Sequence, residues 1–310
     1  MKSPIKLINQ KIQKIKLSQN KAITSLGLAV FTHNKKDRDV ILKKNIRYGK
    51  NHLQKFDFIC PKNPQNTDLP VVFYVHGGSW CGGDKYGYTM FCERIAKQGY
   101  FVANINYRLM PKVSIKTCVA DCIKAIRYLM TNQAKILTNL NINLALSFDN
   151  VFLIGDSAGA QIVSLIAGKQ TSGKIKLKIN IKALGLYYGV FDFNGISHDP
   201  SPIMTDLDAY WKSIYPSTAE LYKSISPTTY VTNKFPPTFM TSGEIDRLHF
   251  QSEVMFRLLK YSNVEVEYLS FEKSRQDARH AFLNAPFLRS AKEAFEHLSK
   301  FLEKHKNWLH

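Results

Sequence analysis

One short stretch limits the fold of this chain more than any other: a strand, a tight turn and a helix in succession between residues 151 and 167. Val151–Ile154 is an apolar run with the length of a buried strand, and the apolar residues after Gly159 recur at helical spacing. Between them stands Gly155-Asp156-Ser157-Ala158-Gly159, a match to the G-x-S-x-G nucleophile elbow. The pattern predicts a reactive Ser157 on a strained turn, against the plainer alternative of a Gly-bounded turn with a capping serine.

Strands and helices alternate along most of the remaining chain. The continuous apolar run 71–75 is typical of a central strand, and residues 114–131 keep their apolar side chains on one helical face. Further strands are expected at about 53–59, 101–107, 183–188, 238–242 and 264–269, and helices at about 249–261 and 287–304. This alternation predicts an α/β fold with a mostly parallel central sheet and helices on both faces. We expect one such domain over residues 46–310.

Residues 191–230 interrupt the alternation. They are rich in Ser, Pro, Asp, Tyr and Trp, with one short helical piece at about 208–215. Because an insertion after a strand on the ligand side of such a sheet often borders the pocket, we expect a small lid or cap here.

The net charge of +19 is concentrated near the N-terminus: residues 1–55 hold fourteen Lys and Arg but only two Asp. Residues 1–45 are therefore predicted to be a basic helical extension or cap. We favour a helix packed on the main domain with a solvated lysine face, because its apolar face lacks Trp or Phe anchors. Peripheral contact with an anionic membrane is the alternative. No aromatic-basic platform accompanies the charge, so no nucleic acid partner is predicted.

Several classes of protein are disfavoured. No run of 18 apolar residues is present, and residues 22–31 are interpreted as a helix segment rather than a signal peptide. The five cysteines show no zinc-ligand spacing, and their odd number favours a reducing compartment. We expect a cytoplasmic protein, membrane-peripheral in the alternative, without metal or cofactor. A homodimer is a possible assembly that the sequence neither favours nor excludes.

A nucleophilic serine needs a histidine to take its proton and a carboxylate to orient that histidine, here in the chain order Ser, acid, His. Asp246 lies on a loop just past the strand at 238–242, and Glu244 is its competitor. His280 alone among the later histidines lies in a loop after the last strand, whereas His249 begins a helix close to the acid. The predicted catalytic residues are therefore Ser157, Asp246 and His280.

An oxyanion hole needs backbone N–H groups directed at the tetrahedral intermediate. The segment His76-Gly77-Gly78-Ser79-Trp80 follows the strand at 71–75 and suits that role, with Ala158 as the donor next to the nucleophile. A Gly-Gly turn beside a buried Trp is the alternative.

Together these motifs resemble the hormone-sensitive-lipase-like branch of the α/β-hydrolases, the bacterial esterase/lipase (carboxylesterase) family. The motifs that carry the resemblance over about residues 46–304 are His76-Gly77-Gly78, Tyr107-Arg108-Leu109-Met110-Pro111, Gly155-Asp156-Ser157-Ala158-Gly159, the Asp246 loop and His280-Ala281-Phe282. The resemblance implies Ser157 as nucleophile, His280 as base and then acid, and Asp246 as the orienting group. It also implies oxyanion donors from Gly78, Ser79 and Ala158, a loop shaped by Gly77, and no cofactor. Ser79 and Ala281 stand where that family usually has glycine.

The predicted function is a carboxylesterase-type serine hydrolase that cleaves small carboxylic esters through an acyl-enzyme. An amidase of the arylformamidase type is the alternative. The segment 76–80 favours it, but Asp156 stands where that group usually carries His. A non-catalytic binding module is the third hypothesis, although such proteins usually lose the Ser or the His that this chain keeps.

Overall fold

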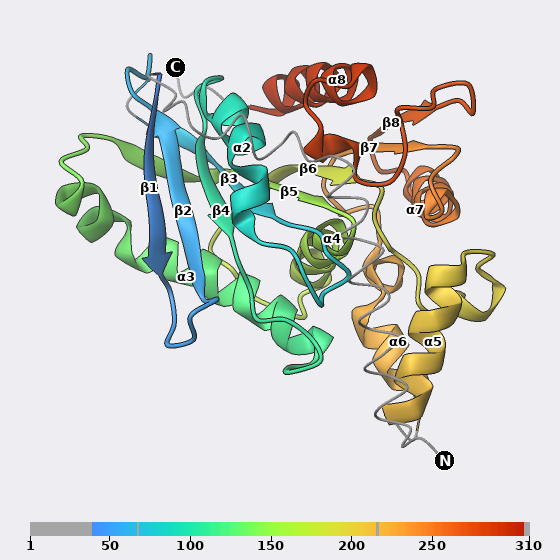
Figure 1. The fold of residues 1–310 in the computed structure, drawn as a ribbon. Coiled ribbons are helices and arrows are strands. Elements are labelled where there is room, and N and C mark those ends of the chain that lie inside the picture. Colours follow the sequence, from blue (N-terminus) through green and yellow to red (C-terminus); the bar gives the residue numbers. More distant parts are fainter. Residues whose placement is uncertain (1–38, 67, 215–216, 307–310) are drawn as a thin grey trace.

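The computed structural model describes residues 39–66, 68–214 and 217–306, which are built around an eight-stranded sheet (Figure 1). In chain order the strands are β1 (Val40–Arg47), β2 (Lys55–Pro61), β3 (Asp68–Val75), β4 (Phe101–Ile105), β5 (Ala145–Asp156), β6 (Ile181–Tyr187), β7 (Thr238–Gly243) and β8 (Val266–Phe271). Across the sheet the order is β1-β2-β4-β3-β5-β6-β7-β8. The β1–β2 and β2–β4 pairs are antiparallel and the other pairs are parallel. The predicted mostly parallel α/β sheet is confirmed.

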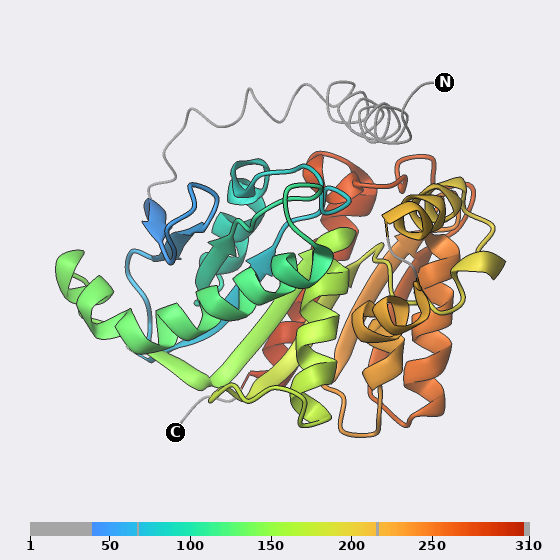
Figure 2. The ribbon, with the colours of Figure 1, turned by 90° about the horizontal axis from the view of Figure 1, so that it is seen from below.

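The central strand β3 explains why both faces of the sheet are covered. Val71, Phe73 and Val75 belong to one hydrophobic cluster, whereas Val72 and Tyr74 on the opposite face belong to another. The helices that cover the first face are α3 (Ile115–Asn139), α4 (Ala158–Thr171) and α7 (His249–Tyr261), and those on the second are α2 (Thr89–Ala96) and α8 (Arg289–His305). Figure 2 looks onto the first of these faces. A strand that is apolar on both sides requires this double cover.

The N-terminal boundary predicted from the sequence is wrong in part. Strand β1 begins at Val40, inside the segment 1–45 that was expected to be helical, and it pairs with β2 from Val40 opposite Pro61. As an edge strand β1 buries little and carries lysines, which hides its alternating pattern. The rest of the predicted extension, residues 1–38, lies outside the described residues.

The insertion between β6 and β7 folds into more helix than the sequence indicated. It contains α5 (Pro202–Ile214), α6 (Ala219–Ile225) and two short 3-10 turns, and it lies beside the sheet in Figure 1. In the part of the chain that the structure describes, no helix is both long and apolar enough to span a bilayer. All five cysteine side chains are buried thiols.

Candidate active site

Ser157 stands on the turn between β5 and α4 with a backbone φ of 50° and ψ of −118°, a conformation that L-residues rarely adopt. The flanking glycines allow this turn. A Cβ at Gly155 would lie 2.5 Å from the carbonyl carbon of Gly159, and a Cβ at Gly159 would lie 2.0 Å from the carbonyl oxygen of Val75. This strained turn therefore places the Ser157 hydroxyl at the carboxyl end of the central strands.

The structure brings the three predicted catalytic residues together. His280 Nε2 lies 3.1 Å from Ser157 Oγ, and His280 Nδ1 lies 2.9 Å from Asp246 Oδ2. The Asp246 side chain is fully buried, and its Oδ1 also accepts the backbone N–H of Leu248. These are hydrogen-bond distances along one line from hydroxyl to imidazole to carboxylate, so the arrangement can move a proton off the serine.

The competing residues point elsewhere. Glu244 accepts a hydrogen bond from the backbone N–H of Lys273 at the surface. His249 Nδ1 lies 3.0 Å from Ser242 Oγ, and that histidine ring stacks on Tyr268. Within the described residues, neither side chain forms a hydrogen bond with Ser157 or His280.

The loop after β3 turns sharply in front of the elbow. Gly78, Ser79 and Trp80 have φ values of 122°, 49° and 58°, and the carbonyl of Gly78 accepts the N–H groups of Cys81 and Gly82. The N–H of Gly77 donates to Asp156 Oδ1 at 2.7 Å, so this glycine shapes the loop and its N–H is not directed at substrate. Ala158 is the first residue of α4, where helix N–H groups have no carbonyl partner within the helix.

Two contacts from the segment after β4 hold this loop. The hydroxyl of Tyr107 donates to the carbonyl of His76 at 2.9 Å, and the N–H of Met110 donates to the carbonyl of Trp80 at 2.9 Å. The ring of Tyr107 also stacks on the imidazole of His76, with centroids 4.5 Å apart. Burial lowers the pKa of His76, which keeps that imidazole neutral.

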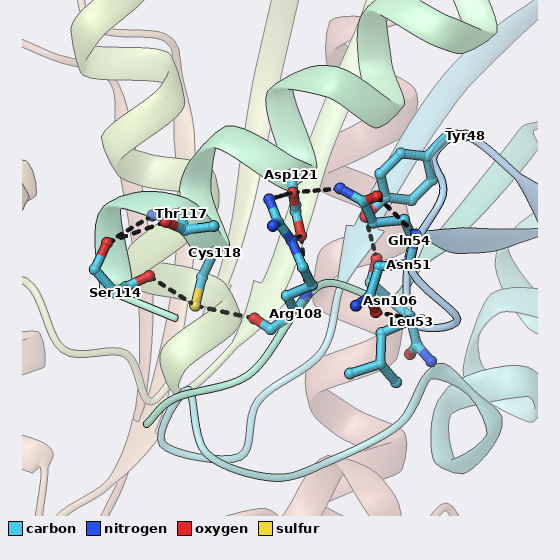
Figure 3. Close-up of polar contacts among 10 residues, drawn as sticks. All are labelled: Tyr48, Asn51, Leu53, Gln54, Asn106, Arg108, Ser114, Thr117, Cys118 and Asp121. Atoms are coloured by element: carbon cyan, nitrogen blue, oxygen red, sulfur yellow. Dashed lines mark hydrogen bonds and ion pairs between the residues drawn. The ribbon is translucent and has the colours of Figure 1, made fainter. Parts of the chain in front are cut away.

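The segment after β4 is fixed in turn by a buried carboxylate (Figure 3). Asp121 on α3 accepts hydrogen bonds from Arg108 Nε and Nη2 at 2.8 and 2.7 Å, from the Arg108 backbone N–H, and from Gln54 Nε2. Burial by itself would raise the pKa of Asp121, but the hydrogen bonds from Arg108 and Gln54 outweigh it and hold that pKa below its usual value. The motif at 107–111 thus anchors the loop that faces the elbow.

An aromatic cluster joins the loop after β3, the predicted oxyanion loop (residues 76–80), to the insertion. The centroid of the Trp80 ring lies 5.8 Å from that of Phe193 and 6.2 Å from that of Trp211, and all three side chains are buried. The Trp80 indole N–H donates to Gln161 Oε1, and Gln161 Nε2 donates to the carbonyl of Ile225 in α6. The insertion is therefore packed against the site as a wall.

Comparison with known proteins matches residues 56–258, well over half of the chain, to the family described as BD-FAE. The chain belongs to the BD-FAE family. This membership confirms the resemblance to the hormone-sensitive-lipase-like branch of the α/β-hydrolases that the motifs indicated.

Two curated relatives of this BD-FAE protein illustrate the range of the match. Esterase LipQ of Mycobacterium tuberculosis is 27% identical over 244 residues, which cover 75% of this chain and 55% of the relative. Hydrolase 4 of Catharanthus roseus is 27% identical over 162 residues, covering 48% of this chain and 51% of the relative. The chain spans about half the length of the curated relatives it matches.

Solved structures share the fold of the BD-FAE protein. Inhibited esterase B from Lactobacillus rhamnosis superimposes with a TM-score of 0.78 at 21% identity, covering 94% of this chain and 96% of that one. A bacterial heroin esterase has a TM-score of 0.75 at 18% identity, covering 96% and 93%. At these identities the likeness concerns the α/β-hydrolase fold.

Sequence reasoning missed several residues that build the site of this BD-FAE protein. The Tyr188 ring packs on His280 with centroids 4.9 Å apart, and Gln251 on α7 holds the start of the insertion by accepting the N–H groups of Phe191 and Asp192. Their partners lie far away in sequence, so no local pattern marks them. Asp156 was visible inside the elbow motif, but its partners were not.

Proposed function

We propose that this protein is a serine hydrolase that cleaves small carboxylic esters through an acyl-enzyme. The observation that carries the proposal is the line of hydrogen-bond distances from Ser157 through His280 to Asp246. Strained elbow geometry at Ser157 supports it further. So does the similarity to LipQ of Mycobacterium tuberculosis, which is an esterase by name.

In the proposed reaction, Ser157 Oγ attacks the ester carbonyl carbon while its proton passes to His280 Nε2. Asp246 stabilises the imidazolium that forms. The oxyanion is proposed to accept hydrogen bonds from the N–H of Ala158, with the loop N–H groups of Gly78 and Ser79 as the further predicted donors. His280 then returns the proton to the leaving alcohol, and a water molecule activated by the same imidazole releases the acid and regenerates Ser157.

The preference for small esters rests on the wall beside the oxyanion loop. Trp80, Phe193 and Trp211 fill that region with buried rings. A structure of esterase B from Lactobacillus rhamnosis is described as inhibited by a tributyrin phosphonate, a compound with four-carbon acyl chains, which agrees with a short acyl group.

The test combines covalent labelling with kinetics. A fluorophosphonate probe should label the wild type but not Ser157→Ala. Hydrolysis of p-nitrophenyl acetate should fall about 10⁴-fold or more in Ser157→Ala and in His280→Gln. His249→Gln, a histidine outside the proposed triad, is the matched control and should keep kcat within about threefold. A wild type that neither binds the probe nor turns over the ester would favour a binding module.

The amidase alternative is separated by substrate. Parallel kinetics on p-nitrophenyl acetate and N-formylkynurenine should show the ester as the better substrate. Activity on the formamide alone would refute the esterase proposal.

Membrane contact through residues 1–45, a homodimer and a cytoplasmic location remain sequence-based predictions. Salt-sensitive binding to anionic vesicles that is lost on deletion of residues 1–38 would support the membrane contact. The deletion should stop there because β1 begins at Val40.

A further inference from the structure

Asp156, the last residue of β5, carries a buried carboxylate that no step of the proposed reaction uses. The residue is 2% exposed. Its Oδ1 accepts the Tyr74 hydroxyl at 2.8 Å and the Gly77 N–H at 2.7 Å, and its Oδ2 accepts the Tyr88 hydroxyl at 2.9 Å. All three donors are neutral groups. A buried carboxylate held by neutral donors is costly to keep charged, so stability alone does not explain its presence.

The contact with Gly77 is close enough to fix the path of the oxyanion loop. A Cβ at Gly77 would lie 2.5 Å from Asp156 Oδ2 and 2.9 Å from the Asp156 carbonyl oxygen, so the loop backbone rests directly on this residue. Immediately after it, Gly78 turns with a φ of 122°. The hydrogen bond from Gly77 to Asp156 therefore fixes the position of the backbone from which the N–H groups of Gly78 and Ser79 follow.

Asp156 is also bonded covalently to the nucleophile. Through its peptide bond it holds Ser157, and through its carboxylate it holds the loop that leaves β3. Since β3 and β5 are neighbouring parallel strands, with Val75 opposite Gly155, this one side chain bridges the two segments that must face each other across the reacting carbonyl. Because a donor placed slightly too far from the oxyanion loses most of its effect, such a bridge bears directly on rate.

We propose that Asp156 is a positioning residue whose carboxylate, by capturing the Gly77 N–H, holds the oxyanion loop at its working distance from Ser157. The inference rests on the proposed esterase function and adds to it a group that acts through the loop without touching substrate.

Ionisation of this carboxylate gives a readout. Burial raises the pKa of Asp156 to about 6, while hydrogen bonds from Tyr74, Tyr88 and Gly77 and the nearby His280 act in the opposite direction. The other titratable groups that interact with it are Tyr107, Tyr188 and Cys92, whose pKa values burial raises so that they stay neutral. Protonation turns one acceptor oxygen of Asp156 into a donor, which leaves three donors competing for fewer acceptors. The hold on Gly77 should weaken as pH falls below about 6.

The contribution of Asp156 to folding stability should depend on pH in the opposite direction to its hold on Gly77. Between the ordinary Asp pKa of about 3.9 and the raised value of about 6, the folded state binds the proton more tightly than the unfolded state does. The contribution of this group to stability therefore falls as pH rises through that window. At pH 8 a neutral Asp156→Asn variant should be at least as stable as the wild type, which separates a positioning role from a structural one.

The experiment measures kcat, KM and Tm for Asp156→Asn and Asp156→Ala with p-nitrophenyl acetate at pH 8, together with inhibition by a boronic acid that mimics the tetrahedral intermediate. We expect kcat to fall about tenfold in Asp156→Asn and about 10²-fold in Asp156→Ala, with KM changed less than about threefold. Boronate affinity should fall in step with kcat. Tyr88→Phe, which leaves the Gly77 hydrogen bond in place, should lose less than about threefold in kcat.

The pH profile supplies the second readout. The roughly tenfold advantage in kcat/KM of the wild type over Asp156→Asn at pH 8 should shrink as pH falls below about 6, because protonation of Asp156 then removes the charge that the variant already lacks. If Asp156→Ala does not fold, Asp156→Asn carries the test. A kcat within about threefold of wild type in Asp156→Asn, or a kcat that falls only together with Tm, would overturn the inference while an active wild type leaves the esterase proposal standing. An unlabelled, inactive wild type would overturn both.

Discussion

Arg108→Ala should destabilise the protein because it strands a buried charge. The Asp121 side chain is 2% exposed, and Arg108 supplies two side-chain hydrogen bonds to it at 2.8 and 2.7 Å. Loss of one partner of a buried ion pair costs about 3–5 kcal/mol. Arg108 is 33% exposed, and Gln54 and the Arg108 backbone N–H stay bonded to the carboxylate, so water and these donors offset part of the loss. We expect a decrease of about 2–3 kcal/mol in the free energy of unfolding.

A double-mutant cycle isolates this pair. Urea unfolding at pH 7, followed by tryptophan fluorescence, should be measured for Arg108→Ala, Asp121→Asn and the double variant. Because Asp121→Asn removes the stranded charge, the double variant should be less destabilised than the sum of the two single variants by about 1–2 kcal/mol. A coupling below about 0.5 kcal/mol would refute the reasoning, since it would mean that Asp121 is stabilised without Arg108.

The sign of the pH dependence is a further check on the same pair. The pKa of Asp121 is lowered in the folded state, so its stabilisation is complete above the ordinary Asp pKa of about 3.9 and is lost as pH falls below that value. The difference between wild type and Arg108→Ala should therefore shrink in acid. A difference that grows below pH 4 would contradict this account.

Two further predictions concern the elbow and the loop. Gly159→Ala should abolish ester hydrolysis and destabilise the fold by more than about 2 kcal/mol, because its Cβ would lie 2.0 Å from the Val75 carbonyl oxygen. Gly87→Ala is the control: its added Cβ would have no atom within 4 Å, so stability in the same urea assay should change by less than about 1 kcal/mol. Trp80→Phe should cost about 1–3 kcal/mol in thermal unfolding, since it leaves the buried Oε1 of Gln161 without its 3.0 Å donor; an unchanged Tm would show that water replaces the indole N–H.

Local patterns predicted the fold where a segment is apolar on both sides or turns on glycine. The run 71–75 and the elbow at 155–159 are of this kind, because their constraints lie within a few residues. Strand β5 is longer than the four apolar residues indicated and starts at Ala145, since its first half carries polar side chains and gains its pairing from β3. The edge strand β1 was missed for the same reason: tertiary pairing, and not its own composition, makes it a strand.

For the site, the chain order of serine, acid and histidine selected residues that the fold then places within hydrogen-bond distance of one another. The supporting contacts could not be predicted in this way. Tyr88 reaches Asp156 across 68 residues and Gln54 reaches Asp121 across 67, so nothing in the neighbourhood of either residue reports its partner. Ala281 stands where the family has glycine and adopts a left-handed φ of 67°. Glycine takes this backbone conformation without strain, whereas alanine takes it at some cost in free energy.

The sheet order divides the proposed catalytic machinery between a protected centre and an open margin. Ser157 follows β5, which has a strand on either side, whereas His280 follows β8, the last strand of the described sheet, which pairs with β7 on one side and is mostly half-buried or exposed. We expect that local opening of this edge would withdraw His280 from Ser157 while the elbow and the central core stay folded. The proposed ester turnover should then report the local stability of one edge of the molecule: in rising urea it should vanish before the fluorescence of the buried Trp80 and Trp211 changes. Activity would thus be lost first by separation of His280 from Ser157, while Ser157 keeps its place on the folded elbow.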